Sequence, residues 1–144
     1  MLRQFLVGGG VSVINIAIHA LVMTILVSVA RASEPRIKPH SSLFLMAVMI
    51  PTVSVLMITH AIEVIVWALA YWIVDAVPPG ANLVYFAFVN YATLGYGDVV
   101  PVKRWLLLGP ITAMNGFLLL GWSTAVIFEV LRRALARTGN ISDD

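Results

Sequence analysis

Three stretches of this 144-residue chain are long and apolar enough to cross a lipid bilayer. A spanning helix needs about 20 mostly apolar residues to cross roughly 30 Å of hydrocarbon, and Phe5–Ala30, Leu43–Val74 and Trp105–Ala134 all exceed that length. In addition, 60% of all residues are hydrophobic and only 11% are charged, a balance that is foreign to soluble domains. The chain is therefore predicted to be an all-α membrane protein with three transmembrane helices.

Charge and cysteine content exclude several other classes of protein. The net charge at pH 7 is only +2, and the basic residues form short clusters between and beyond the apolar stretches, so no nucleic-acid binding is expected. The absence of cysteine excludes disulfides and thiolate chemistry. The first stretch follows a basic Arg3, but its apolar run is longer than the roughly 7–15 residues of a signal peptide. We expect it to remain as a membrane helix.

The basic clusters predict the orientation of the chain. Basic residues follow the first and third stretches: Arg31, Arg36 and Lys38, then Arg132, Arg133 and Arg137. Loops rich in Lys and Arg lie in the cytoplasm, so the C-terminus is assigned there and the N-terminus to the outside. The segment 75–101 then faces outward, where Lys103 and Arg104 depart mildly from the rule. We expect a multi-pass protein of the cell membrane, of prokaryotic plasma-membrane type.

The segment 81–101 is too short to cross the membrane and return as two helices. Its first half is apolar and its second half is rich in Gly and Tyr. A short helix followed by a re-entrant extended stretch fits this pattern, provided that protein or an aqueous cavity covers its backbone. Within the second apolar stretch, Pro51 is expected to kink the helix or to mark its entry into the membrane.

The extended stretch contains the hexapeptide TLGYGD at residues 93–98, which suits cation binding by backbone. A cation that enters a membrane must exchange its water for other oxygens, and peptide carbonyls are neutral acceptors. To aim successive carbonyls at one axis, a strand must alternate between ordinary and left-handed geometry. Glycine reaches the left-handed region without steric cost, which accounts for Gly95 and Gly97.

The other residues of the hexapeptide have expected roles as well. Tyr96 can direct its ring away from the axis and serve as a spacer that fixes the width of the opening. Thr93 can add its hydroxyl oxygen at the inner end. Asp98 is predicted to place negative charge at the outer mouth, where cations gather.

TLGYGD resembles the selectivity-filter motif of the potassium-channel superfamily, usually written T-V-G-Y-G-D. Upstream, Asn82 is suited to cap a helix over Leu83–Ala92 that resembles the family's pore helix. The resemblance covers Leu43 to Ala136 and implies a two-helix pore domain preceded by one extra helix. The implied organisation is an extra helix with a basic loop (1–40), a pore domain (41–137) and a short polar tail (138–144). Within the pore domain lie an outer helix (43–74), a pore helix (83–92), a filter (93–98) and an inner helix (105–135).

The resemblance also implies a function and its residues. The chain would be a passive potassium-selective channel and not an enzyme. Potassium ions would bind the carbonyls of Thr93, Leu94, Gly95, Tyr96 and Gly97, and no cofactor is expected besides these permeant ions. Tyr85 and Phe86 stand where the family places aromatics that support the filter tyrosine. Because one strand cannot surround an ion, a homotetramer among membrane lipids is expected.

Three departures from the family pattern bear on selectivity. Leu94 replaces the usual valine and loses the stiffness of a β-branched side chain, and Asn90 and Ala92 replace frequent threonines. A weakly selective cation channel is therefore the first alternative.

The first apolar stretch carries no arginine ladder, so a voltage sensor is not expected. The gating stimulus and any regulatory partner stay open.

The inner helix contains small and polar residues with two interpretations each. Gly116 lies where related channels carry a hinge glycine, but it would equally permit tight helix packing; Gly121 is a weaker hinge candidate. Asn115, Ser123 and Thr124 are candidates to line the aqueous cavity, or to bond a neighbouring helix.

Four polar residues inside the apolar stretches need partners because ionisable groups are costly in hydrocarbon. His60 and Glu63 are three residues apart and share a helix face, which is expected to meet Asn15 and His19 of the first stretch. Three interpretations are open: a structural fastening of the extra helix, a proton-sensing element, and a metal site. The last two underlie the remaining alternative, a non-conducting membrane sensor or a metalloenzyme.

Overall fold

The computed structural model describes residues 1–32 and 42–139. Its elements are α1 (Leu2–Ala32), α2 (Ser42–Ile73), α3 (Leu83–Tyr91), the short 3₁₀ helix η1 (Lys103–Trp105) and α4 (Leu108–Gly139). No strand occurs within the described ranges, which confirms the all-α expectation. The basic residues Arg36 and Lys38 and most of the polar tail lie outside the described residues.

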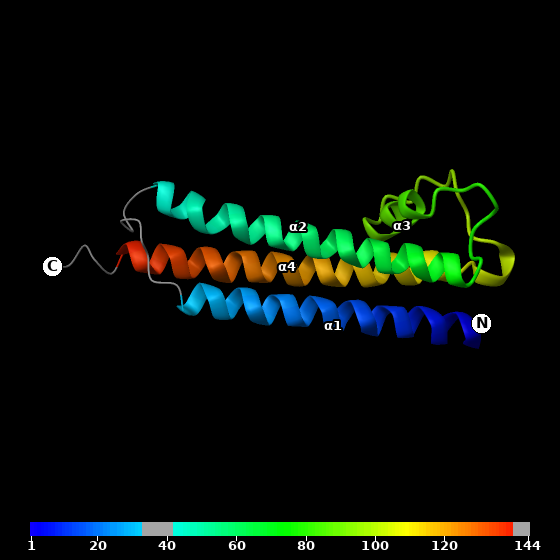
Figure 1. The fold of residues 1–144 in the computed structure, drawn as a ribbon, viewed down its shortest axis with the longest axis horizontal. Coiled ribbons are helices and arrows are strands. Elements are labelled where there is room, and N and C mark those ends of the chain that lie inside the picture. Colours follow the sequence, from blue (N-terminus) through cyan, green and yellow to red (C-terminus); the bar gives the residue numbers. More distant parts are fainter. Residues whose placement is uncertain (33–41, 140–144) are drawn as a thin grey trace.

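The three long helices confirm the three predicted spans. The segments Leu2–Ala30, Ser42–Ile73 and Lys103–Ala136 are each long and apolar enough to cross a membrane. The three helices run side by side, with α4 in contact with both α1 and α2 (Figure 1). The short α3 lies beside the last turns of α2, at the end of the bundle where α1 begins, while α4 ends at the opposite end of the bundle (Figure 1). The segment between α3 and α4 is thus held at one end of the bundle.

Helix α2 continues without a break through Pro51. A proline inside a helix removes one backbone hydrogen bond, and the adjacent Thr52 donates its hydroxyl to the carbonyl of Val48 at 2.8 Å. The helix begins at Ser42, nine residues before the proline. Pro51 therefore does not interrupt the helix, and the kink or membrane entry expected there stays a prediction.

Aromatic side chains fill the core where α2, α3 and α4 meet. Trp67 and Tyr71 are fully buried, with ring centroids 5.9 Å apart. The Tyr71 ring also packs on Phe86 at 4.9 Å, and its hydroxyl lies 2.5 Å from that of Thr112. Tilted aromatic pairs at this separation are favourable beyond the area they bury. They fasten α3 between the two longer helices.

Glycines set the closest helix contacts. A Cβ atom at Gly116 would lie 2.0 Å from the carbonyl oxygen of Tyr91, the last residue of α3. At Gly8 of α1 it would lie 2.9 Å from side-chain atoms of Ile111 in α4. A Cβ at Gly121 would meet nothing within 4 Å. Of the two interpretations of Gly116, the structure therefore supports tight packing, and α4 is continuous through Gly116 and Gly121.

We expect the Gly116→Ala substitution to destabilise the protein. The added methyl group would collide with backbone, which cannot rotate away, and overpacking of this kind costs about 1–3 kcal/mol. The matched control is Gly121→Ala, which has open space and gains helix propensity worth about 0.5–1 kcal/mol. Thermal unfolding in detergent, followed by circular dichroism, should lower the midpoint only for Gly116→Ala. Equal midpoints would contradict the packing role of Gly116.

Candidate functional site

Helix α3 begins and ends as its sequence predicts. Asn82 caps it, since its side-chain oxygen accepts the backbone N–H of Tyr85 at 3.0 Å. The helix ends at Tyr91, one residue before the predicted end. The chain then turns tightly, with the N–H of Leu94 donating to the carbonyl of Val89 at 2.9 Å. This turn directs the TLGYGD segment (residues 93–98) back along α3.

The backbone of the TLGYGD segment alternates in handedness. Thr93, Gly95 and Gly97 have φ angles of +59°, +56° and +78°, whereas Leu94 and Tyr96 between them keep ordinary negative values. The two glycines confirm the predicted alternation. Thr93 was not expected, because a left-handed conformation costs an L-residue roughly 1–2 kcal/mol and a β-branched one adopts it rarely. Such strain persists where surrounding structure imposes it and is frequent at functional sites.

The rest of the chain does not cover the TLGYGD segment. Leu94 is 49% exposed and Tyr96 is 66% exposed. A Cβ atom at Gly95 or Gly97 would meet no atom within 4 Å. The glycines are therefore required by backbone conformation and not by crowding within the chain. In a membrane protein, non-helical backbone of this kind must be covered by protein or must line a water-filled space.

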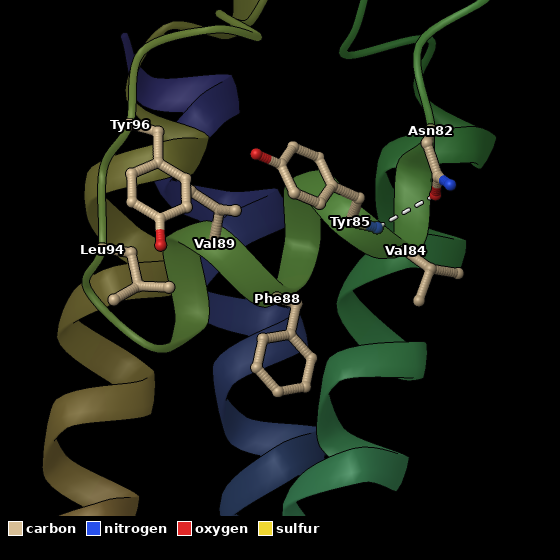
Figure 2. A pocket seen from close by; sticks show the side chains of 7 residues that line it. All are labelled: Asn82, Val84, Tyr85, Phe88, Val89, Leu94 and Tyr96. Atoms are coloured by element: carbon tan, nitrogen blue, oxygen red, sulfur yellow. Dashed lines mark hydrogen bonds between the residues drawn. The ribbon is translucent and has the colours of Figure 1, made fainter.

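An open hollow lies between α3 and the TLGYGD segment. Its lining consists of Asn82, Val84, Tyr85, Phe88, Val89, Leu94 and Tyr96. Figure 2 shows Leu94 and Tyr96 projecting from the extended segment while Tyr85 and Phe88 project from α3. The hollow is mostly apolar, which suits packing against another protein surface.

Of the two aromatics predicted to support Tyr96, only Tyr85 faces the hollow. A hydrogen bond with Asp98 raises the pKa of Tyr85, which places this ring beside the end of the TLGYGD segment. Phe86 is 2% exposed and packs on Tyr71 of α2. Phe86 thus packs away from the TLGYGD segment, because consecutive helix residues point about 100° apart, and its support of Tyr96 stays a prediction.

Two of the three residues proposed for the cavity wall face other helices. Asn115 is 3% exposed and accepts hydrogen bonds from Trp67 at 3.0 Å and from Asn15 at 3.2 Å. Ser123 is 5% exposed and lies 2.9 Å from Nε2 of His60. Thr124 is exposed and donates to its own helix at Leu120. The alternative that inner-helix polar residues bond neighbouring helices thus holds for Asn115 and Ser123.

The polar residues of α1 and α2 meet as predicted. Nδ1 of His19 lies 2.8 Å from Oε1 of Glu63, and Nδ1 of His60 lies 3.0 Å from Oε2. Asn15 donates to the backbone carbonyl of Glu63 at 3.3 Å. Tyr91, at the end of α3, donates its hydroxyl to the same carboxylate. Glu63 therefore connects α1, α2 and α3. Tyr91 is the last residue of α3 and precedes Thr93 by two positions.

Sequence reasoning missed the part that Tyr91 and Ser123 take in this cluster. Tyr91 Oη lies 2.8 Å from Nδ1 of His60, and Ser123 Oγ lies within 3.5 Å of Nε2 of both histidines. Ser123 had been considered only with the inner helix, and nothing in its spacing indicates histidine partners on two other helices. The only available signal for Tyr91 was its polar hydroxyl at the end of an apolar helix.

Some charged residues at each end of the bundle have specific partners. Arg3 stacks its guanidinium 5.2 Å from the ring centre of Trp105, which brings the N-terminus of α1 to the end that carries the TLGYGD segment. At the other end, Glu129 lies 2.8 Å from Arg132 and 2.5 Å from Arg133. A cation–π contact thus marks the end of the bundle where α4 begins, and ion pairs mark the end where α4 finishes.

Comparison with known protein families gives one match. A family model described as "Ion channel" matches residues 59–133. The matched range holds the second half of α2, all of α3, the TLGYGD segment and most of α4, and it omits α1. Searches of curated proteins and of solved structures gave no match to the chain.

We expect Gly95→Ala to destabilise the protein and Gly10→Ala to stabilise it. Both sites are open to an added Cβ, but Gly95 has a left-handed backbone and Gly10 is helical. The strain at Gly95 should cost about 1–2 kcal/mol, while the helical site should gain about 0.5–1 kcal/mol. Thermal unfolding of both variants in the same detergent measures the difference. An unchanged or raised midpoint for Gly95→Ala would show that its backbone conformation is not needed.

Proposed function

The chain belongs to the ion channel family, with a two-helix potassium-channel-like domain and an extra N-terminal helix, and from this premise we propose that it is a passive, potassium-selective channel. The observation that carries the proposal is the alternating backbone at Thr93, Gly95 and Gly97. In that geometry successive carbonyls can be aimed at one axis. No enzymatic activity is proposed.

Permeation would use the backbone oxygens of Thr93, Leu94, Gly95, Tyr96 and Gly97. Carbonyl oxygens replace the water shell of the ion without adding a fixed charge that would trap it. Asp98 follows this row and is exposed, where its negative charge would concentrate cations at the mouth. Its contact with Tyr85 ties the mouth to the exposed end of α3.

We propose a homotetramer as the assembly of this site. One extended segment cannot surround an ion, and identical chains close most simply around a shared axis. The uncovered Leu94 and Tyr96 and the apolar hollow beside them supply a surface for a neighbouring copy to cover. We propose that four copies meet there, with the TLGYGD segments innermost.

A weakly selective cation channel remains the second candidate. The observation that favours it is Leu94 itself, which lacks the stiffness of the more frequent valine. Asn90, at a frequent threonine position, donates to the carbonyl of Phe86 at 2.8 Å within α3. The inner end of the segment therefore has different support from the usual pattern.

We place the chain in the cell membrane with the N-terminus outside and the C-terminus in the cytoplasm. Arg132 and Arg133 lie at the end expected in the cytoplasm. At the outer end, Arg3 is engaged by Trp105 and Arg104 lies 4.0 Å from the carboxylate of Asp75. The pairing of Arg104 offsets part of the mild departure from the charge rule.

Potassium flux into liposomes tests the proposal. The purified chain should carry potassium, and Gly95→Asp should lower the flux at least tenfold because a side chain enters the carbonyl row. The matched control is Gly80→Asp: Gly80 also has a left-handed backbone and open surroundings but lies outside the segment. If Gly95→Asp carried potassium as well as Gly80→Asp and the parent chain do, the proposal would be rejected. The reversal potential in mixed sodium and potassium then separates the selective channel from the weakly selective one.

A further inference from the structure

We propose that His19, His60, Glu63 and Tyr91 form a binding site for a divalent transition-metal ion of the Zn²⁺ class inside the helix bundle. Among the described residues, the ligand atoms of His19, His60 and Glu63 all lie within 4.8 Å of one another. Imidazole nitrogen and carboxylate oxygen are usual zinc ligands. The inference does not depend on whether the chain conducts ions.

Tyr91 supplies the fourth donor from a third helix. Its hydroxyl oxygen lies 2.8 Å from Nδ1 of His60 and bonds Oε2 of Glu63, while Nδ1 of His60 lies 3.0 Å from the same Oε2. Three contacts thus join three atoms. With Glu63 ionised, only two hydrogens are present to serve them, one on nitrogen and one on the hydroxyl. Three atoms with lone pairs therefore converge with only two hydrogens to share. This arrangement suits the ligands of one cation.

The outer nitrogens of both histidines have a shared acceptor. Nε2 of His60 lies 2.9 Å from Ser123 Oγ, and Nε2 of His19 lies 3.5 Å from it. When Nδ1 of a histidine binds a metal, Nε2 carries the hydrogen and needs an acceptor that orients the ring. The two lone pairs of one hydroxyl oxygen can accept both N–H groups. Without the ion, neutral rings that donate from Nδ1 would present two acceptors to the single hydrogen of Ser123.

Charge and burial agree with a cation at this place. The side chains of His19 and Glu63 are fully buried, and that of His60 is 15% exposed. An ionised Glu63 with two neutral histidines leaves one negative charge in the bundle interior, which is costly unless compensated.

A tetrahedral ion would require the side chains of the cluster to rearrange. Tetrahedral zinc with bonds of about 2.0–2.1 Å holds its ligand atoms roughly 3.3 Å apart. The nitrogen–oxygen contacts observed here are 2.8 and 3.0 Å. To hold the ion, these contacts would widen by a few tenths of an ångström, and the most widely separated ligand atoms, up to 4.8 Å apart, would move closer together by side-chain rotation.

A metal at this site would connect the extra helix to the ion pathway. Its ligands come from α1, α2 and α3, and Tyr91 is separated from Thr93 by one residue. Helix α1 lies outside the range matched by the family model. If the proposed channel function holds, the ion would fix the base of the TLGYGD segment to a helix that is not part of the two-helix pore.

Metal content of the purified full-length chain tests this inference directly. The protein in detergent is stripped with a chelator, loaded with Zn²⁺, desalted and measured by elemental mass spectrometry. About one zinc per chain is expected, together with a raised thermal unfolding midpoint, because an ion that binds only the folded state stabilises it. Co²⁺ used as a probe should give the strong visible absorption of a tetrahedral site. Absence of bound zinc in the parent protein would overturn the proposal.

Matched variants identify the ligands. Glu63→Gln keeps the shape of the side chain but removes the charge, and it should weaken zinc binding at least tenfold. Glu129→Gln is the control, because Glu129 pairs with Arg132 and Arg133 away from the cluster and should bind zinc like the parent. Tyr91→Phe, which removes only one oxygen, is measured as well in case Glu63→Gln fails to fold, and should weaken binding and reduce the Co²⁺ absorption. Zinc binding unchanged in both cluster variants would contradict the assignment, whatever the ion flux.

Discussion

Backbone polar groups in hydrocarbon must find their partners within the protein, and the whole architecture follows from this constraint. Each unsatisfied group costs several kcal/mol there, so the three spans are continuous helices, even through Pro51. The TLGYGD segment is the exception, because its alternating backbone forms neither helix nor strand. Such backbone is tolerated at membrane depth only where protein or water covers it. Carbonyls that lack protein partners are then free to accept a cation.

Close helix contacts and hydrogen bonds hold the TLGYGD segment in place. Lipid tails are as apolar as leucine, so helices in a bilayer associate through packing and hydrogen bonds more than through hydrophobic burial. Gly116 lets α4 touch the end of α3, and Asn115 ties Asn15 of α1 to Trp67 of α2. Glu63 then reaches Tyr91 at the base of the TLGYGD segment. The extra helix thereby becomes part of the support for that segment.

Features set by local chemistry could be predicted from the sequence. The spans follow from length and hydropathy, the start of α3 from the capping side chain of Asn82, and the backbone at Gly95 and Gly97 from the freedom of glycine. The meeting of His19 with Glu63 was predicted because buried ionisable groups need partners.

Features set by the way helices rotate and cross could not be predicted. Spacing alone does not say which face of α4 turns inward, so Asn115 and Ser123 were assigned to a cavity wall as readily as to a helix contact. Phe86 turned toward α2 for the same reason. Thr93 adopts a conformation opposed to its own preference, which only the surrounding turn can impose. The contact of Tyr91 with His60 joins residues 31 positions apart and depends on the seating of α3.

The central claim is that several copies of one short backbone segment converge on a common axis. An experimental structure of the assembled protein in a lipid nanodisc with potassium tests it most directly. We expect four chains whose carbonyls from Thr93 to Gly97 form one axial column with ion density along it. Carbonyls that face lipid or packed protein, with no shared column, would contradict it.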